Sequence, residues 1–127
     1  MEIGSSPSLM PELSLLENIK YFLFNENINE TTISNVLDKY ELDSFKSDLI
    51  GDFSSGMVKR SEIAIADLKN PKVLCIDEPK VYLDENGVDL LLNLITKREK
   101  EGNASILSSQ ESIGAFTSIE RSINLND

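Results

Sequence analysis

The chain contains no histidine, and its only cysteine is Cys75. A single cysteine cannot form an intramolecular disulfide, so a disulfide framework is excluded and a reducing compartment is compatible with the composition. The same absences exclude zinc sites built from cysteine and histidine, Ser-His-Asp triads and Cys-His nucleophiles. Any catalysis must therefore depend on carboxylates, hydroxyls, amides or backbone groups.

Basic residues are also scarce, with 12 Lys and Arg against 22 Asp and Glu in 127 residues, which gives a formal net charge of −10. The summed field repels polyanions, so the composition gives no general basis for binding nucleic acid or an acidic membrane. Any bound phosphate must be held locally by backbone donors or a metal. Uncharged apolar runs of about 18 residues and a basic leader are both missing, so we expect neither a membrane span nor a secretory signal.

Hydrophobic residues at 40% and charged residues at 27% are typical of a globular chain. After a loop from Gly4 to Pro11, Ser14 and Glu17 form the spacing of a capping box at the start of a helix that extends to about Asn25. Apolar spacing predicts a second helix from about Glu30 to Tyr40 and a third from Leu42 to Ile50. The first fifty residues or so therefore predict a small helical unit.

Beyond Phe53 the pattern alternates between helices and short apolar strands. A Ser-Ser-Gly turn begins a helix that ends before Asn70-Pro71, and strand and helix then alternate to the end of the chain. The expected elements are a strand Val73 to Ile76 buried on both faces, a helix Asn86 to Glu101, a second buried strand Ala104 to Leu107, a short helix Glu111 to Phe116 and a weak strand Ser122 to Leu125. This alternation predicts an α/β fold with a parallel sheet.

Two adjacent carboxylates, Asp77 and Glu78, follow the first of these strands. Ligands of open parallel sheets bind at the carboxyl ends of the strands, and successive side chains point in different directions. One carboxylate could hold a metal while its neighbour orients water. The alternative is an ordinary solvated transition from strand to loop.

Three stretches around these carboxylates stand in a distinctive order: FSSGMVKR from Phe53, VLCIDEP from Val73 and YLDENG from Tyr82. Their order and spacing resemble the signature sequence, the Walker B strand with its catalytic glutamate and the D-loop of the ATP-binding domains of ABC transporters. The stretch PELSLLENIKYF from Pro11 is similar to the loop and first helix of that family's helical subdomain. The resemblance implies a partial P-loop NTPase core with parallel strands, preceded by a small helical subdomain. Residues 1–52 would be a Q-loop-like segment and the helical subdomain, and residues 53–127 the signature helix and the C-terminal part of the core.

The residues Ser54, Ser55 and Gly56 stand at a predicted helix start, where unpaired amides and the helix dipole favour an anion. The resemblance implies that they contact the γ-phosphate of ATP bound to the opposite subunit. Met57 departs from the usual glutamine and has no side-chain amide to offer. The alternative is that Ser54 is simply an N-cap and Gly56 a flexible residue in the first turn.

The resemblance also implies roles for single residues. Asp77 would hold Mg²⁺ through water, and Glu78 would be the general base that polarises the attacking water. Asp84 would be the D-loop residue that couples two sites of a dimer, or else a helix-initiating acid beside Glu85. The family's switch histidine falls at Gln110, which can hydrogen-bond a γ-phosphate but cannot titrate.

Other positions depart from the family pattern. Nothing in the sequence matches G-x-x-x-x-G-K-[ST], the phosphate-binding loop. The loop glutamine is missing, with Ser5 or Ser6 nearest its place, and Lys80 stands where Ser or Thr is usual. Ser61 and Asp67 occupy helix positions that are apolar in the family. We therefore expect the C-terminal part of an ATPase domain that does not hydrolyse ATP by itself.

The function implied is that of the nucleotide-binding subunit of an ABC transporter, or a split or truncated fragment of it, with ATP and Mg²⁺ as cofactors. The FSSGM stretch and the glutamine at the switch position are similar to subunits of haem export in cytochrome c maturation. Expected partners are a membrane-spanning subunit, a second nucleotide-binding subunit and a separate Walker A-bearing piece, at the cytoplasmic face of a membrane or its organelle equivalent, with no nucleic acid. The alternative is an inactive fragment that pairs with a complete ATPase domain and regulates it.

Overall fold

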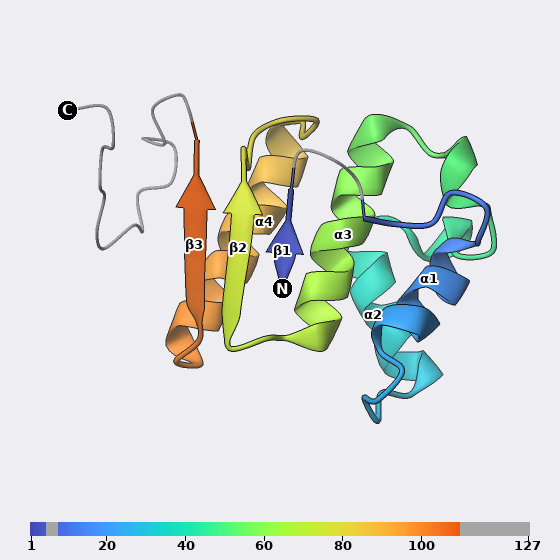
Figure 1. Cartoon of the computed structure of the whole chain (residues 1–127), viewed down its shortest axis with the longest axis horizontal. Helices are drawn as coiled ribbons and strands as arrows, with labels where there is room; N and C mark the ends of the chain where they lie inside the picture. The colour runs from blue at the N-terminus through green and yellow to red at the C-terminus, as the bar shows by residue number, and fades with distance from the viewer. Residues whose placement is uncertain (5–7, 110–127) are drawn as a thin grey trace.

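The computed structural model describes residues 1–4 and 8–109 of the chain. Three parallel strands, β1 (Glu2–Ile3), β2 (Val73–Asp77) and β3 (Ala104–Ser108), form a sheet in the order β1-β2-β3 (Figure 1). The register pairs Glu2 with Cys75 and Cys75 with Ile106. The predicted α/β class with parallel strands is confirmed.

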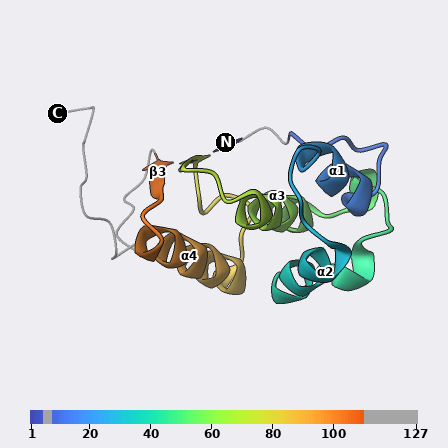
Figure 2. The ribbon, with the colours of Figure 1, turned by 90° about the horizontal axis from the view of Figure 1, so that it is seen from below.

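Four α-helices accompany the described strands: α1 (Leu15–Phe22), α2 (Glu30–Lys39), α3 (Ser55–Lys69) and α4 (Glu85–Lys100). Helices α3 and α4 lie on one side of the sheet, and α1 and α2 lie on the far side of α3 from α4 (Figure 2). Helix α3 is therefore the element that joins the helical unit to the sheet. We call residues 8–52 the helical unit and the sheet with α3 and α4 the α/β layer.

Local signals in the sequence fix where these helices begin and end. The capping box of α1 is present, since Ser14 Oγ accepts from the Glu17 amide at 3.1 Å and Glu17 Oε1 accepts from the Ser14 amide at 3.0 Å. Asn29 caps α2, with its side chain accepting from the Thr32 amide at 2.8 Å. Asn70 ends α3 in the left-handed conformation at φ 44°, which asparagine adopts more readily than most other residues.

One continuous apolar core runs from the helical unit to the sheet. Helix α3 contributes Ile63 and Ile65 to it, and each is about 1% exposed because the helix is covered on both flanks. Further apolar residues with no exposed surface come from every layer of the fold, among them Ile3, Leu15, Ile19, Leu37, Leu74 and Leu91. The helical unit is thus packed onto the α/β layer and is not a detached domain.

The prediction of a third helix over Leu42 to Ile50 is wrong. This stretch forms two short 3-10 turns, Asp43–Phe45 and Ile50–Asp52. Two of its carbonyls, those of Lys46 and Asp48, accept from the unpaired amides of Leu16 and Leu15 at the start of α1. Because these carbonyls serve another helix, they cannot support a regular helix of their own.

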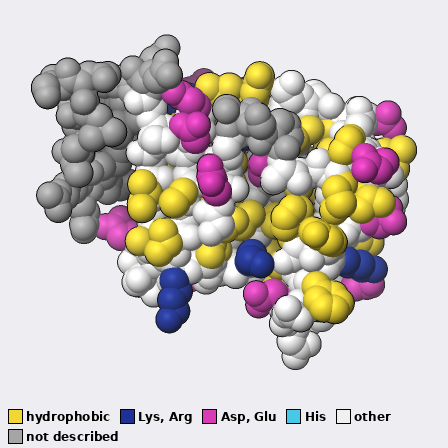
Figure 3. Space-filling view, in the orientation of Figure 1, with side chains coloured by type: hydrophobic (Ala, Val, Ile, Leu, Met, Phe, Trp, Pro, Cys, Tyr) yellow, Lys and Arg dark blue, Asp and Glu magenta, His cyan; other side chains and the backbone are white. Residues whose placement is uncertain are grey.

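The prediction that both strands are buried is also wrong. In β2 only Leu74 and Ile76 are buried, while Val73 is 46% exposed, and Ile106 of β3 is 56% exposed. Helices cover one face of the sheet, and apolar side chains remain visible on the other in the described part of the chain (Figure 3). Strand β1 was not predicted, because two residues are too few to show a period. The helix expected at Glu111 to Phe116 and the strand at Ser122 to Leu125 lie outside the described residues.

Candidate functional site

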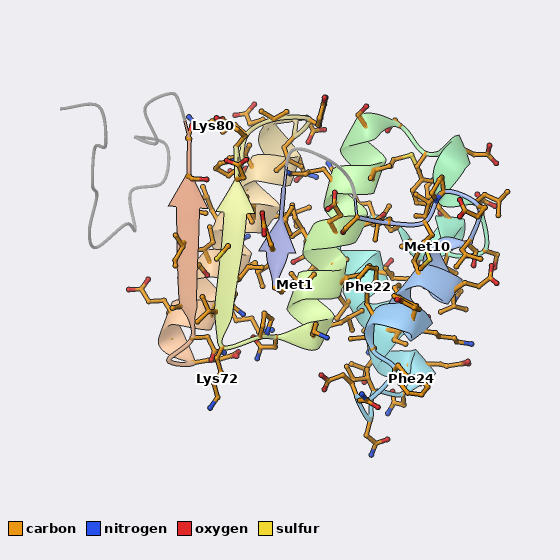
Figure 4. All side chains as sticks on the ribbon, in the orientation of Figure 1. Met1, Met10, Phe22, Phe24, Lys72 and Lys80 are labelled. Carbon is orange, nitrogen blue, oxygen red and sulfur yellow. The ribbon has the colours of Figure 1, made fainter. Side chains whose placement is uncertain are left out.

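Asp77 and Glu78 lie at the carboxyl end of β2, as predicted, and the end of β3 holds them. Ser108 Oγ donates to Asp77 Oδ1 at 2.7 Å, and Ser109 Oγ donates to Glu78 Oε2 at 3.3 Å. The Glu78 amide donates to the Ser108 carbonyl at 2.7 Å. In Figure 4, Lys80 marks the carboxyl ends of the strands and Lys72 marks their amino ends. Sequence reasoning missed both serines as partners, because only the strand register brings them beside β2.

Backbone geometry separates the two carboxylates. Glu78 has φ 51°, a left-handed value that turns the chain out of the strand immediately after Asp77. The two side chains accordingly bond to different hydroxyls of β3. The expectation that they point in different directions agrees with this geometry. Both are half-buried, so water can reach the carboxylates.

The donor chemistry of Asp77 fits magnesium. Mg²⁺ is commonly bound by one or two carboxylates, with water and substrate phosphates supplying the remaining oxygens. Within residues 1–4 and 8–109, no group of three or more Asp, Glu, His or Cys side chains could hold a metal ion. Asp77 could serve as one such carboxylate, with water and substrate phosphates supplying the remaining oxygens.

The start of α3 contains Ser54, Ser55 and Gly56. Ser54 is the N-cap of the helix, since its hydroxyl accepts from the Met57 amide at 3.2 Å. Ser55 is exposed. A Cβ at Gly56 would lie 3.1 Å from the carbonyl oxygen of Tyr82, so glycine permits a close approach of the two segments. Ser54 therefore caps α3, and Gly56 has a packing role and is not merely flexible.

Asp84 is the N-cap of α4 and also an ion-pair partner. Its Oδ1 accepts from the Gly87 amide at 2.7 Å and from Arg60 of α3 at 3.0 Å. The Gly87 N–H and the Arg60 guanidinium lower the pKa of Asp84 below its usual value. Asp84 therefore initiates α4 and at the same time pairs with α3. Arg60, whose connecting role the sequence did not reveal, links Asp84 to the helix that Ser54 begins.

A cavity of about 330 Å³ lies beside these residues. It brings together four of the predicted site residues, Ser54, Gly56, Met57 and Asp84, and it is also lined by Arg60, Tyr82 and residues of the helical unit. Asp77 and Glu78 do not line this cavity. The structure thus divides the predicted site into a helix-start group and a strand-end group. Gln110 lies outside the described residues.

Comparison with known proteins identifies the family. The model of the family described as "ABC transporter" matches residues 3–81, more than half of the chain. The chain belongs to the ATP-binding domains of the ABC transporter family, and its fold is a partial P-loop ATPase core.

Curated relatives agree with this assignment. The lantibiotic transport ATP-binding protein SrtF of Streptococcus pyogenes is 34% identical over 111 residues, which cover 85% of this chain and 48% of the relative. The L-arabinose transport ATP-binding protein AraG of Geobacillus stearothermophilus is 35% identical over 127 residues, 93% of this chain and 24% of the relative. The cytochrome c biogenesis ATP-binding export protein CcmA of Tatumella citrea is 24% identical over 123 residues, 97% of this chain and 58% of the relative. The chain thus spans between 24% and 58% of the length of these relatives.

Solved structures support the fold. The ATP-binding subunit of an ABC transporter matches with a TM-score of 0.75 at 24% identity, over 86% of this chain and 48% of the other. A dimeric ATP-binding cassette bound to ADP and phosphate matches with a TM-score of 0.72 at 24% identity, over 87% and 51%. None of the helices in the described part of the chain is long and apolar enough to cross a membrane.

Proposed function

We propose that this chain supplies the signature, Walker B and D-loop elements of a nucleotide-binding subunit of an ABC transporter, which couples ATP binding and hydrolysis to movement of a membrane partner. The arrangement of the two groups carries the proposal. Arg60 joins Asp84 to the helix that Ser54 begins. At the strand end, Ser108 and Ser109 hydrogen-bond to Asp77 and Glu78. Elements far apart in the sequence are thus brought together where parallel sheets bind ligands.

Each group has a chemical role in this proposal. The amides at the start of α3, with Ser54, Ser55 and Gly56, face the γ-phosphate of a nucleotide bound to a second subunit. Asp77 would hold Mg²⁺, which would neutralise phosphate charge, and Glu78 accepts a hydrogen bond from the attacking water and polarises it. Gln110 provides a hydrogen bond to the γ-phosphate without a titrating charge. The Q-loop-like segment and the helical subdomain lie within residues 1–52, of which β1 (Glu2–Ile3) joins the sheet beside β2, and residues 53–127 form the rest of the ATPase part.

Partners and location follow from the same proposal. A second nucleotide-binding subunit, a membrane-spanning subunit and a Walker A-bearing piece complete the assembly at the cytoplasmic face of a membrane. The similarity to CcmA supports a relation to haem export, but SrtF and AraG are more similar in sequence and their names point to other cargoes. We therefore propose a nucleotide-binding subunit of an ABC transporter and assign no cargo to it.

The test begins with the chain alone and then adds a Walker A-bearing polypeptide. Calorimetric titration of the chain with Mg-ATP should show only weak binding, because the signature donors are half of a nucleotide site. Mixing with the Walker A-bearing polypeptide should produce phosphate release, which Glu78→Gln should abolish while ATP binding persists. Glu85→Gln, an exposed neighbouring carboxylate outside the two groups, is the matched control and should retain turnover.

Three results would count against the proposal. Tight one-to-one ATP binding by the chain alone would show a complete site within it. Equal hydrolysis by the Glu78→Gln complex would remove Glu78 from the role of general base. A complex that changes the turnover of a complete ATPase domain, with no effect of Glu78→Gln, would favour the alternative of a regulatory fragment.

A further inference from the structure

A second cavity, of about 170 Å³, lies between the start of α3 and the end of β1. Three polar residues of α3, Ser55, Lys59 and Glu62, line it, and their spacing of four and three residues places them on one face of the helix. The other lining residues among those described are Gly4, Phe53, Val58 and Tyr82. Tyr82 also borders the cavity beside Asp84, but of the predicted site residues that the structure describes only Ser55 lines this second one.

The wall of this cavity contains two buried side chains of opposite charge. Lys59 and Glu62 are each 3% exposed. Lys59 Nζ donates to the Gly4 carbonyl at 3.2 Å, which is one of the three hydrogen bonds that an ammonium can donate. Ser8 hydrogen-bonds Glu62, yet the Oε2 atom of Glu62 has no hydrogen-bond partner in the described part of the chain. Buried charges in proteins are normally paired, so this pair has binding capacity that the protein does not use.

The two charges attract each other without bonding directly. Glu62 Oε2 has no partner, so it does not reach the ammonium of Lys59, although each charge favours the other. Burial is the main influence on both groups: it lowers the pKa of Lys59 and raises the pKa of Glu62. Protein groups therefore compensate neither charge fully.

Charge and size together define the ligand that would complete this site. A simple cation or anion would leave one net charge buried, whereas a net-neutral molecule can compensate both. Bonds between charged partners are the strongest, which favours a zwitterion over a neutral amide. Since one water occupies about 30 Å³ of liquid, the volume suits a ligand of about five or six non-hydrogen atoms, as in glycine and alanine. Phe53 and Val58 provide an apolar surface for a methyl group.

We propose that the cavity between α3 and β1 binds a small zwitterionic amino acid, whose carboxylate accepts from Lys59 and whose ammonium donates to Glu62. Because Lys59 also bonds to the Gly4 carbonyl, the bound ligand links the start of α3 to the end of β1. The orphaned oxygen of Glu62 has a specific purpose in this arrangement. The site needs no nucleotide and no second polypeptide, so it does not rest on the function proposed above.

An NMR titration of the ¹⁵N-labelled full chain with L-alanine tests the site. The amide signals of Gly4 and Ser55 should shift and saturate with a dissociation constant of about 1 mM or below, an affinity within reach of so small a ligand. Glu62→Gln should weaken binding about tenfold or more, because it removes the charge that faces the ammonium. Lys59→Gln should do the same for the carboxylate. Acetate and methylammonium carry one charge each and should bind at least tenfold more weakly than L-alanine, and L-leucine should be too large.

Two further variants keep the test decisive. Val58→Phe retains both charges and fills the cavity, so it should abolish binding even if Lys59→Gln does not fold, as judged by circular dichroism. Asp89→Asn removes an exposed carboxylate of α4 and should bind L-alanine like the parent. Absence of saturable shifts in the parent, or equal affinity in the folded Glu62→Gln and Val58→Phe variants, would overturn the site. Equal binding of acetate or methylammonium would overturn the choice of a zwitterion.

Discussion

At the scale of single residues, Glu62 of α3 is the carboxylate least suited to its surroundings. It is 3% exposed, and Ser8 hydrogen-bonds it, but its Oε2 atom has no hydrogen-bond partner among the described residues. Burial raises the pKa of Glu62, and the charge of nearby Lys59 only partly opposes this. Lys59 is itself buried and donates to the Gly4 carbonyl at 3.2 Å. The charged form of Glu62 is therefore disfavoured in the folded state.

We predict that Glu62→Gln stabilises the chain at neutral pH. A folded-state pKa above the unfolded value means that Glu62 favours folding below its ordinary pKa of about 4.3, and that this contribution is lost as the pH rises through the folded-state value. Glutamine resembles the protonated form, so the free energy of unfolding should rise by of order 1 kcal/mol at pH 7 and change little near pH 4.

Urea unfolding at the two pH values measures this difference. The exposed Glu99→Gln is the charge-matched control, and it should leave the free energy of unfolding nearly unchanged at both pH values. A Glu62→Gln chain less stable than the parent at pH 7 would show that the attraction between Glu62 and Lys59 outweighs the cost of burial.

At the scale of elements, two adjacent serines stand at the start of α3, and only one of them caps the helix. Ser54 caps the helix, whereas Ser55 is the first helical residue and its side chain is exposed. Ser54→Ala should lower the free energy of unfolding by about 1 kcal/mol, because it leaves an amide of the first turn unpaired. Ser55→Ala removes the equivalent hydroxyl one position later, and its free energy of unfolding should lie within about 0.5 kcal/mol of the parent value.

Thermal unfolding followed by circular dichroism compares the two alanine variants. Ser54→Asp, which retains an acceptor at the N-cap, should recover most of the stability lost in Ser54→Ala. If both alanine variants were equally destabilised, the loss would come from a property the two serines share and not from the cap.

Elements whose signals are local could be predicted from the sequence. The capping box at Ser14, the cap at Ser54 and the stop at Asn70 each depend on residues within a few positions, and all three are present. The stretch Leu42 to Ile50 could not be predicted, because its carbonyls pair with α1, about thirty residues earlier in the chain. At the site, Asp77 and Glu78 were located from their own strand. Their partners Ser108 and Ser109 come from another strand, and Arg60 meets Asp84 only because α3 and α4 pack together.

At the scale of the whole molecule, the sheet is covered unequally. Helices α3 and α4 cover one face (Figure 2), and the apolar core continues from them into the helical unit. On the other face Val73 and Ile106 are exposed, and within residues 1–4 and 8–109 β3 pairs only with β2. An apolar face beside a strand with unpaired backbone groups is a template for association with another chain.

We predict that the isolated chain self-associates through this face and edge, and that Ile106→Lys weakens the association. Burying an isoleucine side chain contributes about 1.5–3 kcal/mol, so its replacement by a charged residue should weaken dimerisation by roughly tenfold or more. Sedimentation velocity over a range of concentrations measures the dimerisation constant.

Phe24→Lys is the control, because Phe24 is 84% exposed and lies at the end of the helical unit, away from the sheet (Figure 4). Both variants reduce the net charge of −10 equally, so a general loss of repulsion would strengthen association in both. Weaker association in Ile106→Lys alone would locate the contact on the sheet, whereas a chain that stays monomeric at every concentration would show that the exposed face does not drive association.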